Sequence, residues 1–341
     1  MNFPTVAFLI SHETSGKKLL FDLGCRKDFW NLPQPISSTI EAKVPGIKVD
    51  HNLADILVDG GLDLAELDAA IISHHHYDHM GDPSTFPLGM KLIVGPGFSE
   101  HFLPGYPEAE ASPAFIDSFK GREIIEVEFS EKLAVAGFPA TDYFDDGSLF
   151  ILNTPGHAIG HLSALVRTTE DTFVFLGGDI CHFGGSFRPT KHMPLPESLS
   201  SGDIVSPGGP EEPQSFSCSL LTSCHPTPTY ARTTPFYKPC SRDDSWYVQP
   251  SQALESIEHL QALDADERVL VLIAHDPSTM DSLPFFPHNN INSWRADGLK
   301  EKIRWRFLSE LPIEGIQRKY LVDGTYQNGK RVRDLDGRQV A

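Results

Sequence analysis

Short apolar runs that stop abruptly at a polar residue recur along this chain and predict strands followed by loops. The first two runs, Ala7–Ile10 and Leu19–Phe21, predict a hairpin that turns through Ser15-Gly16. Later runs of the same kind are Ala69–Ile72, Lys91–Val94, Phe150–Leu152, Phe173–Leu176 and Val269–Ile273. All of these later runs except Lys91–Val94 lead into a histidine or an aspartate shortly after the strand. Because loops at strand ends can present a site from a rigid sheet, we expect a functional site there.

Helices are fewer and alternate with the strands. The segment Ser251–Leu263 places leucine and isoleucine side chains near one face and has Ser251 as its expected N-cap. Two further candidates are His51–Val58 and Leu299–Leu308, the second after an Asp297 cap. Strands interleaved with helices predict an α/β or α+β sandwich.

The segment 183–250 differs from the rest of the chain, because it is rich in Pro, Ser, Thr and Gly and carries scattered aromatic residues. A loop-rich stretch of this length is usually either functional or disordered. The aromatic residues favour an ordered cover over the site, and the alternative is a surface insertion that packs on the body. We therefore expect one domain over residues 1–341, with this insertion and a helical or extended tail at 297–341.

Composition and charge narrow the function classes. The 341 residues are 40% hydrophobic and 22% charged, which suits a globular protein with a sizeable core. The formal net charge of −18 argues against nucleic acids and anionic membranes as partners. No apolar stretch is long enough for a transmembrane helix, and the first residues carry no basic signal region. The five cysteines form no CxxC pair, so we expect reduced thiols in a cytoplasmic protein.

The run Ser73–His79 concentrates the chemistry of the chain in the pattern His-x-His-x-Asp-His, formed by His74, His76, Asp78 and His79. Zinc and related metal ions bind imidazole nitrogen and carboxylate oxygen, and few structural roles need so many of these groups together. Alternate residues of an extended segment point to one side, so His74 and His76 can share an ion. Asp78 and His79 follow in a turn and can face a second ion.

Two ions need more ligands than this run supplies, and the candidates are His157, Asp179 and His275, each after a predicted strand. A single histidine after Pro-Gly, or an aspartate in a Gly-Gly-Asp turn, is ordinarily a loop residue. The joint occurrence of all three in this order reverses that expectation. The chain is therefore interpreted as a metal-dependent hydrolase.

These motifs resemble those of the metallo-β-lactamase superfamily. The resemblance is carried by His74-x-His76-x-Asp78-His79, Thr154-Pro155-Gly156-His157, Gly177-Gly178-Asp179 and Ala274-His275, and by Asp22 after the strand that contains Leu19–Phe21. It covers roughly residues 5–280. It implies an α+β fold, the single-domain αββα sandwich, with a dinuclear site at one edge of the two sheets.

The resemblance also implies a role for each matching residue. His74, His76 and His157 would hold the first metal, Asp78, His79 and His275 the second, and Asp179 would bridge both. Asp22 would orient ligand groups from behind, as outer partners of metal ligands do. His75 is expected to point away from the metals, and Tyr77 to pack beside the site. Both ions are expected to be divalent, with Zn²⁺ preferred over iron, manganese or cobalt, which the same ligands accept.

Two divalent ions that share a hydroxide would provide a nucleophile at neutral pH. This hydroxide would attack the carbonyl of a small lactone or lactam, such as a secondary metabolite, a signal molecule or a xenobiotic. Asp78 and Asp179 would be the catalytic carboxylates. Tyr77, Tyr230 and Tyr237 are the candidate substrate contacts, and a phenol from the insertion would complete the oxyanion site.

Two alternatives remain open at this point. The first is a thioesterase of the glyoxalase II or acyl-carrier type, which the charge of −18 disfavours because glutathione and phosphopantetheine carriers are anionic. The second is a non-catalytic metal-binding protein, which the complete ligand set disfavours. Within the resembled family, a bridging aspartate is typical of lactonases and thioesterases and not of the antibiotic-degrading lactamases.

Three further segments, Gly81–Pro87, Val94–Phe98 and Leu103–Pro107, resemble a fungal group of the superfamily that is related to N-acyl homoserine lactone lactonases. Related proteins usually have another strand pair before the strand that ends at Asp22, so this chain is either a short variant or one that lacks an edge strand beside the pocket, and the sequence leaves both open. The substrate and the oligomeric state are left open, with a homodimer as one candidate.

Overall fold

The computed structural model describes residues 2–200, 215–311 and 320–340. Contacts divide the chain into two compact units, each assembled from separate stretches of sequence. Unit 1 comprises Met1–Pro4, Phe129–Ala158 and Ser163–Lys319, and unit 2 comprises Thr5–Glu128, Ile159–Leu162 and Tyr320–Ala341. Parts of the predicted insertion at 183–250 and of the tail at 297–341 lie outside the described residues, so the predicted domain limits stay predictions.

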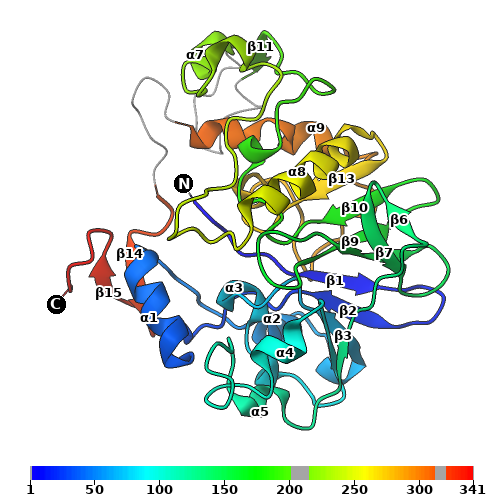
Figure 1. Ribbon diagram of the computed structural model, residues 1–341, viewed down its shortest axis with the longest axis vertical. Coiled ribbons are helices and arrows are strands. Elements are labelled where there is room, and N and C mark those ends of the chain that lie inside the picture. The colour runs from blue at the N-terminus through cyan, green and yellow to red at the C-terminus, as the bar shows by residue number, and fades with distance from the viewer. Residues whose placement is uncertain (1, 201–214, 312–319, 341) are drawn as a thin grey trace. The chain divides into compact units, whose positions relative to one another are not determined.

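Unit 2 contains a five-stranded sheet in the order β1-β2-β3-β4-β5 (Figure 1). Its strands are β1 (Phe8–Ser11), β2 (Lys18–Phe21), β3 (Leu67–Ile71), β4 (Lys91–Val94) and β5 (Ile124–Glu126). The first two strands form the predicted hairpin, and the other neighbours pair in parallel. Because β2 and β3 run in the same direction, their carboxyl ends meet at one edge of the sheet, and Asp22 and the histidine run follow there.

Short helices make up much of the remainder of unit 2. They are α1 (Gln34–Lys43), α2 (Leu53–Asp59), α3 (Tyr77–Met80), α4 (Phe98–Phe102) and α5 (Ile116–Phe119), with 3-10 turns at Phe29–Asn31, Leu64–Glu66 and Pro83–Thr85. The helix predicted at 51–58 is α2. It begins with a capping box, in which the side chains of Asn52 and Asp55 each accept a hydrogen bond from the other residue's backbone N–H.

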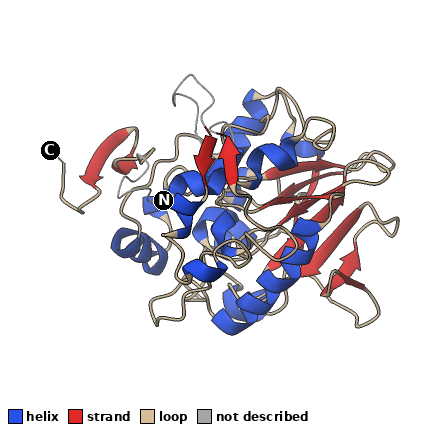
Figure 2. Ribbon diagram, turned by 90° about the horizontal axis from the view of Figure 1, so that it is seen from above, coloured by secondary structure: helices blue, strands red, loops and turns tan. Residues whose placement is uncertain are grey.

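A carboxyl-terminal hairpin, β14 (Gly324–Gln327) and β15 (Lys330–Asp334), lies beside α1 in both views (Figures 1 and 2). The Arg333 guanidinium donates to the backbone carbonyl of Glu41 at 2.7 Å and to that of Val44 at 3.1 Å. The Ile47 N–H donates to the Gly324 carbonyl at 3.0 Å. Segments that are far apart in the sequence therefore build one part of unit 2.

Unit 1 contains a six-stranded sheet in the order β13-β10-β9-β8-β7-β6. Its strands are β6 (Ala134–Val135), β7 (Phe138–Asp142), β8 (Leu149–Asn153), β9 (Leu162–Arg167), β10 (Phe173–Leu176) and β13 (Val269–Leu272). The helix α8 (Pro250–Ala265) packs on this sheet, since its Ile257 and Leu260 share a buried core with Phe175. This is the helix predicted at 251–263. Its N-cap is Gln249 and not Ser251, because Pro250, whose fixed φ suits the first turn of a helix, already lies inside it.

The described part of the predicted insertion shares an apolar core with the segment 305–311 of unit 1, including Phe183, Leu195, Phe236, Trp305 and Phe307. It contains β11 (Ser198–Ser200) paired with β12 (Ser215–Ser217), α7 (Ser219–Thr222), and 3-10 turns at Gly184–Ser186 and Pro228–Tyr230. After a 3-10 turn at Pro277–Thr279, the helix predicted at 299–308 is α9 (Leu299–Arg304) and a separate 3-10 turn, Arg306–Glu310. Its N-cap is Gly298, with φ of 65°, and not Asp297. None of the helices in the described ranges is long and apolar enough to cross a membrane.

Candidate metal centre

The Asp22 carboxylate forms hydrogen bonds with two residues of the histidine run, Ser73 and His79. Asp22 follows β2, is 1% exposed and has φ of 62°, a left-handed conformation that aspartate tolerates better than most residues. Its Oδ1 accepts the Ser73 backbone N–H at 2.7 Å, and its Oδ2 accepts the Ser73 hydroxyl at 2.9 Å. The same Oδ2 lies 2.8 Å from Nδ1 of His79. Because a carboxylate can only accept, this Nδ1 carries the hydrogen.

Ser73 extends the network to His74. The Ser73 hydroxyl gives its one hydrogen to Asp22 and therefore accepts a hydrogen bond from Nδ1 of His74 at 3.0 Å. Both His74 and His79 thus carry the hydrogen on Nδ1 and the lone pair on Nε2, which is a form that binds a metal ion. Both side chains are buried, so the network is shielded from water. Sequence reasoning predicted this role for Asp22 but missed Ser73.

The other residues of the run are placed by the turn into α3. His76 is the N-cap of this short helix, which carries Asp78 in its first turn. The rings of His74 and His76 lie 4.5 Å apart, as expected for alternate residues on one side of an extended segment. His75 instead stacks on Phe102 with ring centroids 4.2 Å apart. Burial lowers the pKa of His75 to about 4, so it is a neutral ring at pH 7.

The segment after the histidine run is held in shape by Arg122. This side chain donates at 2.5 to 3.0 Å to four backbone carbonyls, those of Pro83, Phe86, Pro87 and Met90. Each carbonyl is an acceptor that needs a partner when it is turned away from water. One guanidinium therefore satisfies four backbone acceptors of this loop.

In unit 1, His157 lies on a turn that presses against the start of α8. Gly156 has φ of 121°, and a Cβ there would lie 2.1 Å from the backbone nitrogen of Ala253, so the position requires glycine. The Val248 N–H donates to the His157 carbonyl at 3.0 Å. The turn is therefore fixed by α8 on one side and by the end of the predicted insertion on the other.

Asp179 follows β10, and two imidazole side chains lie close to its carboxylate. Nε2 of His157 lies 3.4 Å from Oδ2 of Asp179, and Nε2 of His275 lies 3.1 Å from Oδ1. Nδ1 of His275 donates to the Pro4 carbonyl at 2.9 Å, so a neutral His275 directs the lone pair of Nε2 at the carboxylate. Two such acceptors repel each other unless a cation lies between them. A metal ion shared by the imidazole and the carboxylate fits this arrangement.

Two residues that sequence reasoning missed join this cluster in unit 1. Nε2 of His182 lies 3.2 Å from Oδ2 of Asp179, and Nδ1 of His182 lies 3.1 Å from the Tyr247 hydroxyl. Burial raises the pKa of the Tyr247 phenol well above its ordinary value, so the hydroxyl keeps its proton at neutral pH. The position of His182 shortly after Asp179 was an available signal. Nothing in the sequence around Tyr247 marks it.

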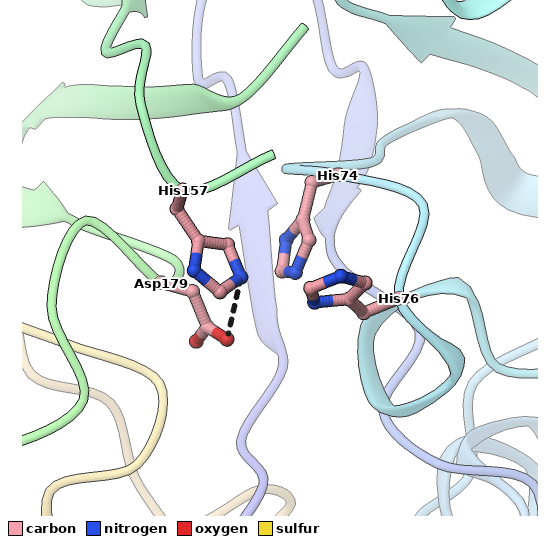
Figure 3. A group of neighbouring side chains, drawn as sticks. All are labelled: His74, His76, His157 and Asp179. Carbon is pink, nitrogen blue, oxygen red and sulfur yellow. Dashed lines mark ion pairs between the residues drawn. The ribbon is translucent and has the colours of Figure 1, made fainter. Parts of the chain in front are cut away.

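Among the described residues, the donors that could hold a metal ion fall into two groups. The first is His74, His76, His157 and Asp179, and the second is Asp78, His79 and His275. Figure 3 draws the first group and marks the ion pair between His157 and Asp179. The two groups contain every ligand predicted from the sequence, and neither includes His75 or His182.

The predicted substrate contacts have less defined surroundings. Tyr77 packs, partly buried, against an apolar cluster around Phe29. Tyr230 is 60% exposed and Tyr237 is 37% exposed. The roles predicted for these three tyrosines stay predictions. The phenol from the insertion that contacts the histidines of unit 1 is that of Tyr247.

Sequence comparisons relate the chain to fungal enzymes. A family model described as the metallo-beta-lactamase superfamily matches residues 2–179. The chain is 38% identical over 323 residues to gamma-lactamase FDB1 of Fusarium pseudograminearum, and the match covers 91% of this chain and 75% of that protein. It is 39% identical over 251 residues to gamma-lactamase MBL2 of Gibberella moniliformis, which covers 71% of this chain and 100% of that protein.

The fold is also found in a solved structure, a variant of AiiA from B. thuringiensis with N-decanoyl-L-homoserine bound at the active site. The two structures match with a TM-score of 0.53 at 19% sequence identity, over 84% of this chain and 87% of that chain. This likeness confirms the predicted fold class, the mixed α and β fold of the metallo-β-lactamases. The match to the family model and the identity to the fungal relatives together establish that the chain belongs to the metallo-β-lactamase superfamily and is a hydrolase.

Proposed function

We propose that this hydrolase uses two divalent metal ions, with Zn²⁺ preferred, to open the ring of a small lactone or lactam. The observation that carries the proposal is the geometry of His275 in unit 1. Its Nδ1 donates to the Pro4 carbonyl, while its Nε2 faces the Asp179 carboxylate at 3.1 Å. In a neutral His275 both atoms are hydrogen-bond acceptors, and a cation bound by both would replace their repulsion with attraction.

In this proposal each ion has three ligands of its own and one that is shared. His74, His76 and His157 would hold one ion, and Asp78, His79 and His275 would hold the other. Asp179, which is grouped with the first three, would be shared because its Oδ1 also lies 3.1 Å from Nε2 of His275. Imidazole nitrogens and carboxylate oxygens are donors that zinc accepts. The bound ions would supply Lewis acidity and lower the pKa of water enough to provide a nucleophile at neutral pH.

Residues behind the ligands keep them ready for this role. The Asp22 and Ser73 network fixes the hydrogen of His74 and His79 on Nδ1, and the Pro4 carbonyl does the same for His275. Because these tautomers are set in advance, the ligand nitrogens need no rearrangement to bind an ion. Asp78 is the candidate carrier of the proton that passes from the attacking water to the leaving group.

The substrate class rests on relatives and on chemistry. The two fungal relatives are named gamma-lactamases, and the structural neighbour binds N-decanoyl-L-homoserine, which is chemically a ring-opened lactone. A lactone and a lactam present the same cyclic carbonyl to a nucleophile. Addition of one water breaks the ring C–O or C–N bond. The water oxygen ends in the new carboxylate, one of its protons ends on the leaving oxygen or nitrogen, and the other is released when the carboxylic acid ionises.

Metal analysis of the purified chain, combined with a panel of lactones, lactams and thioesters, tests the proposal. We expect close to two metal ions per chain and preferential hydrolysis of the cyclic substrates. Asp179→Ala should lose bound metal and abolish hydrolysis. The control Asp171→Ala, which changes an exposed carboxylate of the same unit, should retain both properties.

Three results would contradict the proposal in different ways. A metal content near zero would refute the metal centre. Hydrolysis of thioesters alone would favour a thioesterase, even though the charge of −18 disfavours anionic acyl carriers. Bound metal without hydrolysis of any substrate in the panel would favour a non-catalytic metal-binding protein.

A further inference from the structure

The amino-terminal segment Asn2–Pro4 is anchored to the body of unit 1 on both sides of Phe3. The backbone N–H of Asn2 donates to Oε2 of Glu310 at 3.2 Å, and Asn2 itself is buried. The Pro4 carbonyl accepts a hydrogen bond from Nδ1 of His275 at 2.9 Å. Because both of its neighbours are held in this way, the backbone of Phe3 is fixed in place.

Phe3 is turned outward between these two anchors, with 55% of the residue exposed. Its ring meets that of His275 edge to face, with centroids 6.0 Å apart and planes 89° apart. The same imidazole places its Nε2 3.1 Å from Oδ1 of Asp179. One imidazole ring therefore links an exposed phenyl ring to the carboxylate that the two ions would share.

The exposed ring of Phe3 favours contact with an apolar group. A ligand that covers apolar surface gains free energy in proportion to the area that is removed from water. Phenylalanine has two rotatable side-chain bonds and the backbone here is anchored, so little conformational entropy is lost when the ring is covered. A charged group would lose its hydration in the same place without a compensating partner.

The place of Phe3 beside His275 gives its exposure a meaning. Exposed apolar side chains are ordinary on protein surfaces. Phe3 is distinguished by its contact with a histidine that belongs to one of the two candidate ligand groups. In the proposed reaction the carbonyl of the lactone or lactam reacts at the metal centre, so a group attached to that ring lies close to the ligand side chains. An apolar group on the side of His275 would cover the ring of Phe3.

We propose that Phe3 is a specificity-determining residue, and that its ring contacts an uncharged apolar group, an acyl chain or an aryl ring, attached to the lactone or lactam. The inference rests on the proposed function and narrows its substrate class to cyclic esters or amides that carry such a group. It gives the segment Asn2–Pro4 two roles, because the backbone of Pro4 holds a candidate ligand and the side chain of Phe3 contacts the substrate.

The test uses the metal-loaded protein and substrate pairs that share a reacting ring but differ in their apolar group. The pairs are N-butanoyl- with N-decanoyl-L-homoserine lactone, and 2-pyrrolidinone with N-phenyl-2-pyrrolidinone. The unchanged protein should prefer the larger member of the pair that it opens. Phe3→Ala should lower this preference, the ratio of the two kcat/KM values, by about 10-fold. The loss should appear in KM, because the contact is the same in the substrate and in the transition state.

Binding of the ring-opened products gives a second measurement that does not depend on turnover. In calorimetry, N-decanoyl-L-homoserine should bind to Phe3→Ala about 10-fold more weakly than to the unchanged protein, and N-butanoyl-L-homoserine should be affected much less. Phe3→Leu keeps an apolar side chain and should retain most of the preference. Metal content should be the same in both variants, because a backbone carbonyl holds His275. The control Phe115→Ala removes an exposed ring of unit 2 that contacts Tyr106, and it should leave the preference unchanged.

The outcomes separate this inference from the proposed function. A metal-loaded protein that opens neither kind of ring overturns both. Ring opening by an unchanged protein that shows no preference for the larger member overturns the role of Phe3 alone, as does an equal preference in Phe3→Ala. An equal loss for both members of a pair also overturns it, because Phe3 would then act on the reaction through His275. A dimer that becomes a monomer in Phe3→Ala with its preference intact would assign the ring to an interface between copies of the chain.

Discussion

Replacement of Asp22 by asparagine tests the network behind the histidine run. The change keeps the size of the side chain, and asparagine also tolerates the φ of 62° at this position. The amide oxygen can still accept the Ser73 backbone N–H. The amide NH₂ group, however, takes the place of Oδ2 and faces the Nδ1–H of His79. His79 must then move its hydrogen to Nε2, the nitrogen proposed to bind metal.

The expected magnitude follows from the bonds that are lost. Of the three hydrogen bonds that the carboxylate accepts, those at 2.9 Å and 2.8 Å end on Oδ2 and cannot form with an NH₂ group. Removal of such a partner behind a metal ligand weakens metal binding by about 10- to 100-fold, or about 1.4 to 2.8 kcal/mol. The loss should appear for the metal held by His79 and, through Ser73, for that held by His74.

Competition with a chromophoric chelator measures this affinity. Thermal unfolding in excess chelator shows whether the metal-free fold is itself weakened. The matched control is Asp82→Asn, the same chemical change at a carboxylate that caps the turn Pro83–Thr85, and it should leave the affinity unchanged. Equal metal affinities for Asp22→Asn and the unchanged protein would refute the reasoning.

Three further predictions concern stability. Arg122→Leu removes the donor to four backbone carbonyls and should lower the free energy of unfolding by about 2–4 kcal/mol in urea denaturation; a loss below about 1 kcal/mol would contradict this. The buried guanidinium of Arg188 donates to the Asp264 carboxylate at 2.5 and 2.8 Å, so Asp264→Ala leaves this cation without its anion and should lower the free energy of unfolding by about 3–5 kcal/mol; an unchanged melting temperature would argue that the pair is dispensable. Gly156→Ala forces a methyl group onto the backbone of α8 and should destabilise the protein far more than Gly61→Ala, where φ is also positive but nothing lies within 4 Å; equal losses in thermal melts would exclude the packing explanation.

The candidate metal ligands could be picked out of the sequence because several of them follow buried strands. Phe173–Leu176 and Val269–Leu272 are apolar runs with mostly or wholly buried side chains, and such a strand ends where polar residues begin. Asp179 and His275 come shortly after these two ends. The two strands pair in parallel, so both residues leave the sheet at the same edge. The apolar pattern therefore marks both positions, and the parallel pairing that the structure shows brings them to one edge.

The residues that were missed depend on contacts that no local pattern records. Ser73 resembles an ordinary loop serine until Asp22, which lies 51 positions earlier, accepts its hydrogen bonds. Tyr247 reaches His182 from 65 positions away. The helix α1 also escaped prediction, although Ile36, Ile40 and Val44 recur at intervals of four residues and pack in one apolar cluster. Hydrogen-bond direction and long-range contact are properties of the folded chain.

The hairpin beside α1 has a consequence for translation. Most of unit 2 is synthesised before residue 129. Gly324 and Arg333, which form hydrogen bonds with Ile47 and with the end of α1, are synthesised only after unit 1. In unit 1, likewise, the Pro4 carbonyl has its hydrogen bond from His275 only once His275 has been synthesised. Chains usually begin to fold from the amino-terminal end during synthesis. Unit 1 therefore cannot complete these contacts before His275 is synthesised, and unit 2 cannot complete its own before Gly324 and Arg333 are. A chain that stalls before His275 would leave both units unfinished.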